Sequence, residues 1–318
     1  MDSSTFQNTY EAMKSQIARV VIGQEDVVDG LLAAVIARGH VLLEGAPGLG
    51  KTLVARALAG VSGFEFKRIQ FTPDLMPSDV TGSSVFDRQT STFTFIPGPI
   101  FAQLLLADEI NRAPAKTQSS LLEAMQERQV TVDGVSRPLP RPFIVVATQN
   151  PVESQGTYPL PEAQLDRFLV KLNVGDPPAD VERTIVRRHA DGFDPSDLSI
   201  LTRVTAPEVL LAMQDHAQRV RIDDVVVNYI VELVRRTRDN RAIELGASPR
   251  ASIALLKAAQ VLAAASGRDF VTPDDVKPMA LPVLRHRVML HPDAELQGQT
   301  PDDCIRVILQ DTPVPRPS

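Results

Sequence analysis

The stretch Gly45-Ala46-Pro47-Gly48-Leu49-Gly50-Lys51-Thr52 fits the pattern G-x-x-x-x-G-K-[ST]. It lies between an apolar run, Val41 to Leu43, which predicts a strand, and the run Leu53 to Leu58, which predicts a helix. Glycines allow the backbone to curl so that its N–H groups converge on phosphate oxygens, and the start of the helix adds its positive dipole end. Lys51 would contact the β and γ phosphates, and the Thr52 hydroxyl suits Mg²⁺. The segment therefore predicts a phosphate-binding loop in an α/β fold.

A pair of acids follows a second apolar strand. Leu104 to Leu106 and Ala107 lead into Asp108 and Glu109. At the carboxyl end of a strand beside the phosphate loop, Asp108 can hold Mg²⁺ through its water shell, and Glu109 can polarise a water for attack on the γ phosphate. This pair favours hydrolysis over phosphoryl transfer to a small molecule.

A third strand, Phe143 to Thr148, brings Gln149 and Asn150 to the same edge. The Asn150 side chain would orient the attacking water or sense the γ phosphate. As a turn residue before Pro151 it would need no such role, and the sequence leaves both interpretations open.

The first half of the chain predicts a parallel five-stranded sheet flanked by helices. The expected strands are His40 to Glu44, Glu65 to Phe71, Gln103 to Asp108, Phe143 to Thr148 and Phe168 to Asn173. The expected helices are Ser4 to Val20, Lys51 to Gly60 and Ala115 to Gln129. Two hairpins interrupt this alternation, at 84–96 and at 129–138, and the second has an Asp133-Gly134 turn.

The pattern changes at Gly175-Asp176-Pro177-Pro178, after which apolar residues recur at helical spacing. We therefore expect an α/β nucleotide-binding core over residues 1–176 and an all-α domain over residues 177–318. The expected helices of the second domain are Val181 to Ala190, Ala206 to Arg219, Asp223 to Arg238, Pro249 to Ala265 and Thr272 to Arg285.

Composition excludes several classes of function. The 318 residues include 33 Lys plus Arg and 39 Asp plus Glu, a net charge of -6, which disfavours binding to nucleic acid through a general charge field. Cys304 is the single cysteine and the five histidines lack metal-ligand spacing, so no zinc site is expected. The longest apolar run, Leu31 to Ala37, is too short for a membrane span, and the N-terminus does not read as a secretion signal, so a cytoplasmic location is expected.

The sequence resembles the AAA+ ATPases, and within them the MoxR family, over nearly its whole length. The resemblance rests on six segments: Val21 to Gln24, Gly45 to Thr52, Leu106 to Pro114, Ala147 to Pro151, Pro161 to Phe168 and Ala247 to Arg250. The run from Asp108 to Pro114 and the run from Pro161 to Phe168 are specific to that family.

The resemblance implies ATP and Mg²⁺ at the cleft between the α/β core and a helical lid, in a homo-hexameric ring. Val21, Ile22 and Gly23 would lie against the adenine, and the loop from Gly45 to Leu53 would hold the phosphates. Asn150 would be the first sensor, Arg250 the second sensor that reaches the γ phosphate, and Arg167 the finger that enters the neighbouring subunit's site. Arg112 is a weaker candidate for the subunit interface.

The family further implies ATP hydrolysis that drives remodelling, assembly or metal-cofactor insertion of a client protein, with an adaptor that carries a von Willebrand factor A domain. The two hairpins would face the pore of the ring, where Phe93, Phe95 and Ile96 would either grip a client or be buried, and Val132 and Val135 raise the same question. Two other functions stay open: a nucleic-acid-dependent motor, since helicase relatives carry the same insertions, and a nucleotide switch that does not hydrolyse. The acidic composition disfavours the first, and Glu109 with Asn150 disfavours the second.

Overall fold

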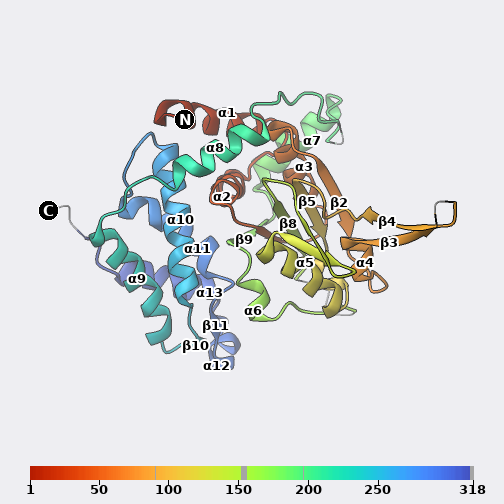
Figure 1. The fold of residues 1–318 in the computed structure, drawn as a ribbon. Coiled ribbons are helices and arrows are strands. Elements are labelled where there is room, and N and C mark those ends of the chain that lie inside the picture. The colour runs from red at the N-terminus through yellow and green to blue at the C-terminus, as the bar shows by residue number, and fades with distance from the viewer. Residues whose placement is uncertain (90, 152–155, 196, 316–318) are drawn as a thin grey trace.

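A computed structural model of the protein describes residues 1–89, 91–151, 156–195 and 197–315. Its centre is a five-stranded parallel sheet in the order β2-β5-β8-β1-β9 (Figure 1). The strands are β1 (Val41–Glu44), β2 (Phe66–Gln70), β5 (Leu104–Asp108), β8 (Ile144–Gln149) and β9 (Val170–Asn173). All five lie where the sequence predicts them.

Side chains of each central strand alternate between two cores, because successive residues of a strand point to opposite faces of the sheet. In β5, Leu104 and Leu106 join one apolar cluster while Leu105 and Ala107 join the other. This burial on both faces explains why β5 reads as a continuous apolar run rather than as an alternating one.

Helices cover both faces of the sheet. They are α1 (Ser3–Ala18), α2 (Glu25–Ile36), α3 (Lys51–Ser62), α4 (Pro77–Thr81), the 3₁₀ turn η1 (Ile110–Arg112), α5 (Ala115–Glu127) and α6 (Glu162–Leu165). The prediction omitted α2, whose residues from Leu31 to Ile36 are all buried. A helix that is buried on most sides lacks the polar stripe by which an amphipathic helix is recognised.

The two expected hairpins are present. They consist of β3 (Gly82–Asp87) with β4 (Thr92–Pro97), and of β6 (Gln129–Val132) with β7 (Val135–Pro138). Asp133 and Gly134 both have positive φ, at 53° and 76°, as a tight primed turn requires. The β3–β4 hairpin projects away from the rest of the molecule (Figure 1).

The second domain is helical, as expected. Its helices are α7 (Ala179–Ala190), α8 (Pro207–Ala217), α9 (Asp224–Asp239), α10 (Pro249–Ala265), α11 (Pro273–Leu284), α12 (Pro292–Leu296) and α13 (Pro301–Asp311). The prediction omitted α12 and α13, and the structure adds a short antiparallel pair, β10 (Ile243–Leu245) with β11 (Met289–Leu290).

Helix α7 is placed apart from helices α8 to α11 of the helical domain. Helices α8 to α11 share one apolar core with α1 and α2, whereas α7 has no buried residue and lies near α3 (Figure 1). The first helix after the expected domain boundary is therefore placed beside the phosphate loop. In the part of the chain that the structure describes, no helix is both long and apolar enough to cross a membrane.

Candidate active site

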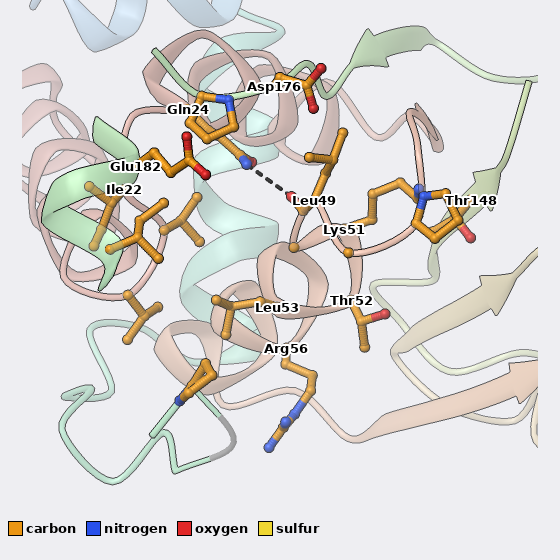
Figure 2. Close-up of a pocket in the computed structure, with 18 of the residues that line it drawn as sticks. Ile22, Gln24, Leu49, Lys51, Thr52, Leu53, Arg56, Thr148, Asp176 and Glu182 are labelled. Atoms are coloured by element: carbon orange, nitrogen blue, oxygen red, sulfur yellow. Dashed lines mark hydrogen bonds between the residues drawn. The ribbon is translucent and has the colours of Figure 1, made fainter. Parts of the chain in front are cut away.

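A pocket of about 830 Å³ opens at the carboxyl ends of the central strands (Figure 2). Its walls combine the phosphate loop from Pro47 onward, the ends of β5 and β8, the segment before α2, and α7. The predicted residues that line it are Val21, Ile22, Pro47, Gly48, Leu49, Gly50, Lys51, Thr52, Leu53, Asp108, Glu109 and Asn150. Gly23, Gly45 and Ala46 support these walls without lining them.

The phosphate loop depends on its glycines. Gly48 and Gly50 have φ of 84° and 81°, a region that side chains rarely adopt. A Cβ on Gly45 would lie 2.3 Å from the carbonyl oxygen of Val174, so only glycine fits there. The chain can therefore turn directly from β1 into α3, and Lys51, Thr52 and Leu53 at the start of α3 line the pocket.

Lys51 is held within this loop. Its Nζ donates hydrogen bonds to the carbonyl oxygens of Gly45 and Ala46. Partial burial lowers the pKa of Lys51 from its ordinary value, and the carboxylates of Asp108 and Glu109 oppose that shift. The ammonium group lies close to both acids and is available as a point charge for phosphate.

Asp108 is buried and bonded through both oxygens. Its Oδ1 accepts a hydrogen bond of 2.5 Å from the Thr148 hydroxyl, and its Oδ2 accepts from Arg68 Nη2 at 2.7 Å. The Thr52 hydroxyl lies 3.5 Å from the same Oδ2. The two predicted magnesium-binding side chains, Thr52 and Asp108, are thus brought together from positions 56 residues apart.

Glu109 adopts a left-handed backbone conformation, with φ of 54°. Its N–H donates to the Thr148 hydroxyl at 2.9 Å, and its Oε2 accepts from Gln70 Nε2 at 2.7 Å and lies 3.2 Å from Arg112 Nε. Non-glycine residues with positive φ are held there only by their surroundings. The Thr148 contact fixes where the Glu109 side chain leaves the strand.

Sequence reasoning missed three polar residues around these acids: Arg68, Gln70 and Thr148. Arg68 Nη2 also donates to Gln70 Oε1 at 3.0 Å, so a continuous chain of contacts runs from Asp108 through Arg68 and Gln70 to Glu109. The register of β2 against β5 pairs Gln70 with Asp108. No local motif marks these residues, because their role depends on which strands are neighbours.

The other end of the pocket is largely apolar. Its lining includes Val20, Val21 and Ile22, then Ile185, Val186 and His189 of α7, and Phe193. Gly23, at φ of 69°, allows Val181 to approach so closely that a Cβ would lie 2.4 Å from it. Gln24 donates to the carbonyl oxygen of Leu49 at 3.0 Å and ties this segment to the phosphate loop (Figure 2). The site thus has a polar end suited to phosphates and an apolar end suited to a nucleobase.

The residues present fit a magnesium nucleotide. Mg²⁺ prefers hard oxygen ligands and usually binds through one or two protein oxygens, phosphates and waters. Thr52 and Asp108 offer such oxygens next to a loop whose N–H groups can hold phosphate. Asn150, at 6% exposure, lines the same pocket from the end of β8.

Arg167 and Arg250 lie elsewhere. They line a second pocket of about 260 Å³, and no residue that the structure describes lines both pockets. Arg167 Nη1 donates to the Leu122 carbonyl oxygen at 2.6 Å, and Arg250 Nη1 lies 3.6 Å from Asp166 Oδ2. Helix α10 carries Arg250 and packs with α1 and α2, so the chain does not bring Arg250 to its own phosphate loop.

This second pocket is strongly basic. It is lined by six cationic side chains and one carboxylate, that of Asp166. The cations are Arg38, Arg128, Arg167, Arg250, Lys257 and Arg287. Such a surface suits an anion that comes from outside the chain.

His40 and His286 have structural contacts. His40 Nδ1 accepts from the Val145 N–H at 3.0 Å and Nε2 lies 3.2 Å from the Met125 carbonyl oxygen, while burial lowers the pKa of His40 to about 4. His286 Nε2 lies 3.0 Å from the Phe168 carbonyl oxygen, and burial lowers its pKa as well. Both rings are therefore neutral packing groups.

Comparison with known proteins agrees with this architecture. The family model of the ATPase family associated with various cellular activities (AAA) matches residues 40–170, and that of the AAA lid domain matches residues 235–308. The chain is similar to a protein of Cytophaga hutchinsonii whose crystal structure is assigned as an ATPase, with a TM-score of 0.89, 38% identity, and coverage of 99% of this chain and 97% of that one.

Two curated relatives match along most of their length. YeaC of Bacillus subtilis (strain 168), an uncharacterized protein, is 50% identical over 299 residues, which is 94% of this chain and 92% of YeaC. Chaperone MoxR1 of Mycobacterium tuberculosis is 43% identical over 318 aligned positions, which cover 97% of this chain and 83% of MoxR1. The chain therefore belongs to the MoxR family of AAA+ ATPases.

Proposed function

We propose that this protein hydrolyses ATP with Mg²⁺ in a homo-hexameric ring and uses the reaction to remodel or assemble client proteins. The observation that carries the proposal is the meeting of Lys51, Thr52, Asp108 and Glu109 at one pocket. The core and the helical lid, with a boundary near residue 176, form the working unit, and a cytoplasmic location remains the expectation from the sequence.

The chemistry follows from the contacts of these residues. Lys51 and the loop N–H groups bind the β and γ phosphates, and Mg²⁺ held by Thr52 and Asp108 would add positive charge there. Glu109 accepts a proton from a water as the water oxygen bonds to the γ phosphorus, and the bond to the bridging oxygen breaks to give ADP and phosphate. Asn150 orients that water from the end of β8.

Glu109→Gln tests this assignment. The amide keeps the shape of the side chain but cannot take the proton, so ATP should bind as before while turnover falls by about a hundredfold or more. Glu123→Gln, on the exposed side of α5, is the matched control and should retain the parent rate. Turnover of Glu109→Gln at the parent rate, with equal ATP affinity, would remove Glu109 from this role.

The second pocket supports a ring. Arg167 and Arg250 stand together on a basic surface away from the phosphate loop of their own chain, so a phosphate that they contact must come from another subunit. We accordingly propose that both arginines act across the interface, Arg167 as the finger and Arg250 as the second sensor. Mixing Arg167→Ala subunits with Lys51→Ala subunits should restore turnover, because each supplies what the other lacks.

The β3–β4 hairpin supports a polypeptide client over nucleic acid. Phe93 is 74% exposed and packs against Phe86 with ring centroids 5.2 Å apart, and Ile96 is also exposed. Arg137 of the other hairpin lies over the Phe95 ring at 4.0 Å, so this cation is engaged within the protein. The projecting ribbon thus exposes several aromatic and aliphatic side chains among its polar ones, a surface suited to contact with an unfolded segment. Client choice would pass through a separate adaptor with a von Willebrand factor A domain.

A further inference from the structure

Arg287, in the turn that follows α11, uses every N–H of its guanidinium group. Nε donates to Asp166 Oδ1 at 2.7 Å, Nη1 donates to the carbonyl oxygens of Leu169 and Val283, and Nη2 donates to those of Phe168 at 2.6 Å and Asp166 at 3.4 Å. An arginine has five such donors, so none is left for solvent or a ligand. With a side chain only 4% exposed, Arg287 is a fixed strut between the lid and the core.

The core end of this strut surrounds Arg167. Three of the carbonyl oxygens that Arg287 binds belong to residues 166, 168 and 169, on either side of Arg167. His286 adds a further contact to the same segment, since its Nε2 lies 3.0 Å from the Phe168 carbonyl oxygen. The main chain that carries Arg167 is therefore held by the lid, while the Arg167 side chain reaches back to Leu122 of α5.

Asp166 extends the same arrangement to Arg250. One carboxylate oxygen binds the buried Arg287, and the other lies 3.6 Å from the guanidinium of Arg250, whose side chain is 67% exposed. One partner is buried and the other is largely exposed. Asp166 thus sets the resting place of Arg250 beside Arg167.

We infer that Arg287 is a positioning residue for the basic pocket: through Asp166 and the main chain of residues 166–169 it sets where Arg167 and Arg250 meet a phosphate of the neighbouring subunit. This inference rests on the proposed trans action of those arginines. Arg287 itself touches no nucleotide, and its effect appears at the neighbour's site rather than at the pocket of its own chain.

Arg287→Lys is the informative change, because lysine keeps the charge but offers three donors from a single point and cannot span four carbonyl oxygens and a carboxylate. Arg167 should then lose its fixed position, and misplacement of a catalytic group by about 1 Å can cost on the order of a hundredfold in rate. Turnover of Arg287→Lys rings should fall at least tenfold. Their affinity for ATP should stay unchanged, because Arg287 does not line the pocket that contains Lys51.

Arg285→Lys is the matched control. Arg285 lies two residues earlier, is also largely buried, and pairs with Asp302 inside the lid, away from residues 166–169. Its replacement should lower the thermal stability of the lid to a similar extent without the loss of turnover. Equal loss of turnover in both variants would show that lid stability alone explains the effect.

Mixed rings show whether Arg287→Lys impairs the Arg167 finger, which acts on the neighbouring subunit, or the nucleotide pocket of its own chain. In a one-to-one mixture of Arg287→Lys with Lys51→Ala subunits, about a quarter of the sites combine an intact phosphate loop with an intact neighbouring finger, so turnover should rise to about a quarter of the parent rate. Without rescue, the turnover of the mixture would be half that of rings made of Arg287→Lys subunits alone, because only half of the subunits have an intact phosphate loop. Ring formation is checked by native mass spectrometry.

The mixture of Arg167→Ala with Lys51→Ala subunits distinguishes the role of Arg287 from the trans action of Arg167. Recovery with Arg167→Ala but not with Arg287→Lys overturns the inference about Arg287 and leaves the trans finger intact. Recovery with neither, in rings that form, overturns the trans finger itself. Should Arg287→Lys fail to fold, Asp166→Asn takes its place. The amide oxygen still accepts from Arg287 Nε, but the negative charge beside Arg250 is lost, so turnover should fall and the same recovery is expected.

Discussion

Thr148→Val should uncouple the two acids of the active site. The Thr148 hydroxyl is fully buried, donates to Asp108 Oδ1 at 2.5 Å, and accepts from the Glu109 N–H at 2.9 Å. One hydroxyl thus orients the carboxylate proposed to hold Mg²⁺ and the backbone that carries the proposed base. Valine has nearly the same volume, so the substitution removes both contacts with little change in packing.

The magnitude follows from these two bonds. A hydrogen bond to a charged group contributes about 1.5 to 3 kcal/mol, and a donor left without a partner costs about 1 to 3 kcal/mol. Valine is better accommodated than threonine in an apolar core, which offsets part of the loss. We expect the free energy of unfolding to fall by about 2 to 4 kcal/mol, and kcat to fall about tenfold or more as Glu109 leaves its strained conformation.

Urea unfolding and steady-state ATPase kinetics measure these effects. Thr148→Ser keeps the hydroxyl and loses only a methyl group, so it should retain most of kcat and lose about 1 kcal/mol of stability. If Thr148→Val matches the parent in both stability and kcat, or if Thr148→Ser loses as much activity as Thr148→Val, the hydroxyl does not organise Asp108 and Glu109.

Three further outcomes are expected. Burial lowers the pKa of His40 to about 4 in the folded chain, so the unfolded chain binds a proton first as pH falls from 6.5 to 4, and the free energy of unfolding drops by about 3 kcal/mol over that range. His40→Gln should reduce this pH dependence of the free energy of unfolding, measured by urea denaturation at several pH values, and an unchanged pH dependence would contradict the expectation. Phe93→Ala should change the free energy of unfolding by less than about 0.5 kcal/mol yet lower client-stimulated turnover. Phe95→Ala removes the ring contact with Phe101 at 5.7 Å and the cation–π contact with Arg137, so it should lower the free energy of unfolding by about 1 to 2 kcal/mol. Gly45→Ala should weaken ATP binding at least tenfold in a fluorescent-nucleotide titration, because its Cβ would meet the Val174 carbonyl oxygen; parent affinity would show that the loop can shift.

The strands and the phosphate loop could be predicted because their signals are local. A strand buried on both faces is a short apolar run, and the loop from Gly45 to Thr52 has a fixed spacing of glycines before a helix. Both hairpins could be predicted for the same reason, because each has a polar turn between two short strand-like runs. Helix α2 escaped prediction since a helix buried on most sides has no continuous polar face to reveal its period.

The partners of the acids required the fold. Arg68, Gln70 and Thr148 reach Asp108 and Glu109 because β2 and β8 both neighbour β5, and strand order is a property of the whole sheet. Helix α7 was predicted as a helix, but its place at the apolar end of the pocket depends on how residues 175–195 return over α3.

The sequence by itself predicted a glycine loop suited to nucleotide phosphates, an acid pair suited to hydrolysis, and an α/β core joined to a helical lid, since each of these follows from residue type at fixed spacing. Only the tertiary structure decided that Arg167 and Arg250 share a basic pocket away from the phosphate loop, and that Arg287 binds the main chain on either side of Arg167. The physical reason is that a guanidinium reaches only a few ångströms, so its partner is set by the packing of α10 and α11 against the core and not by its neighbours along the chain.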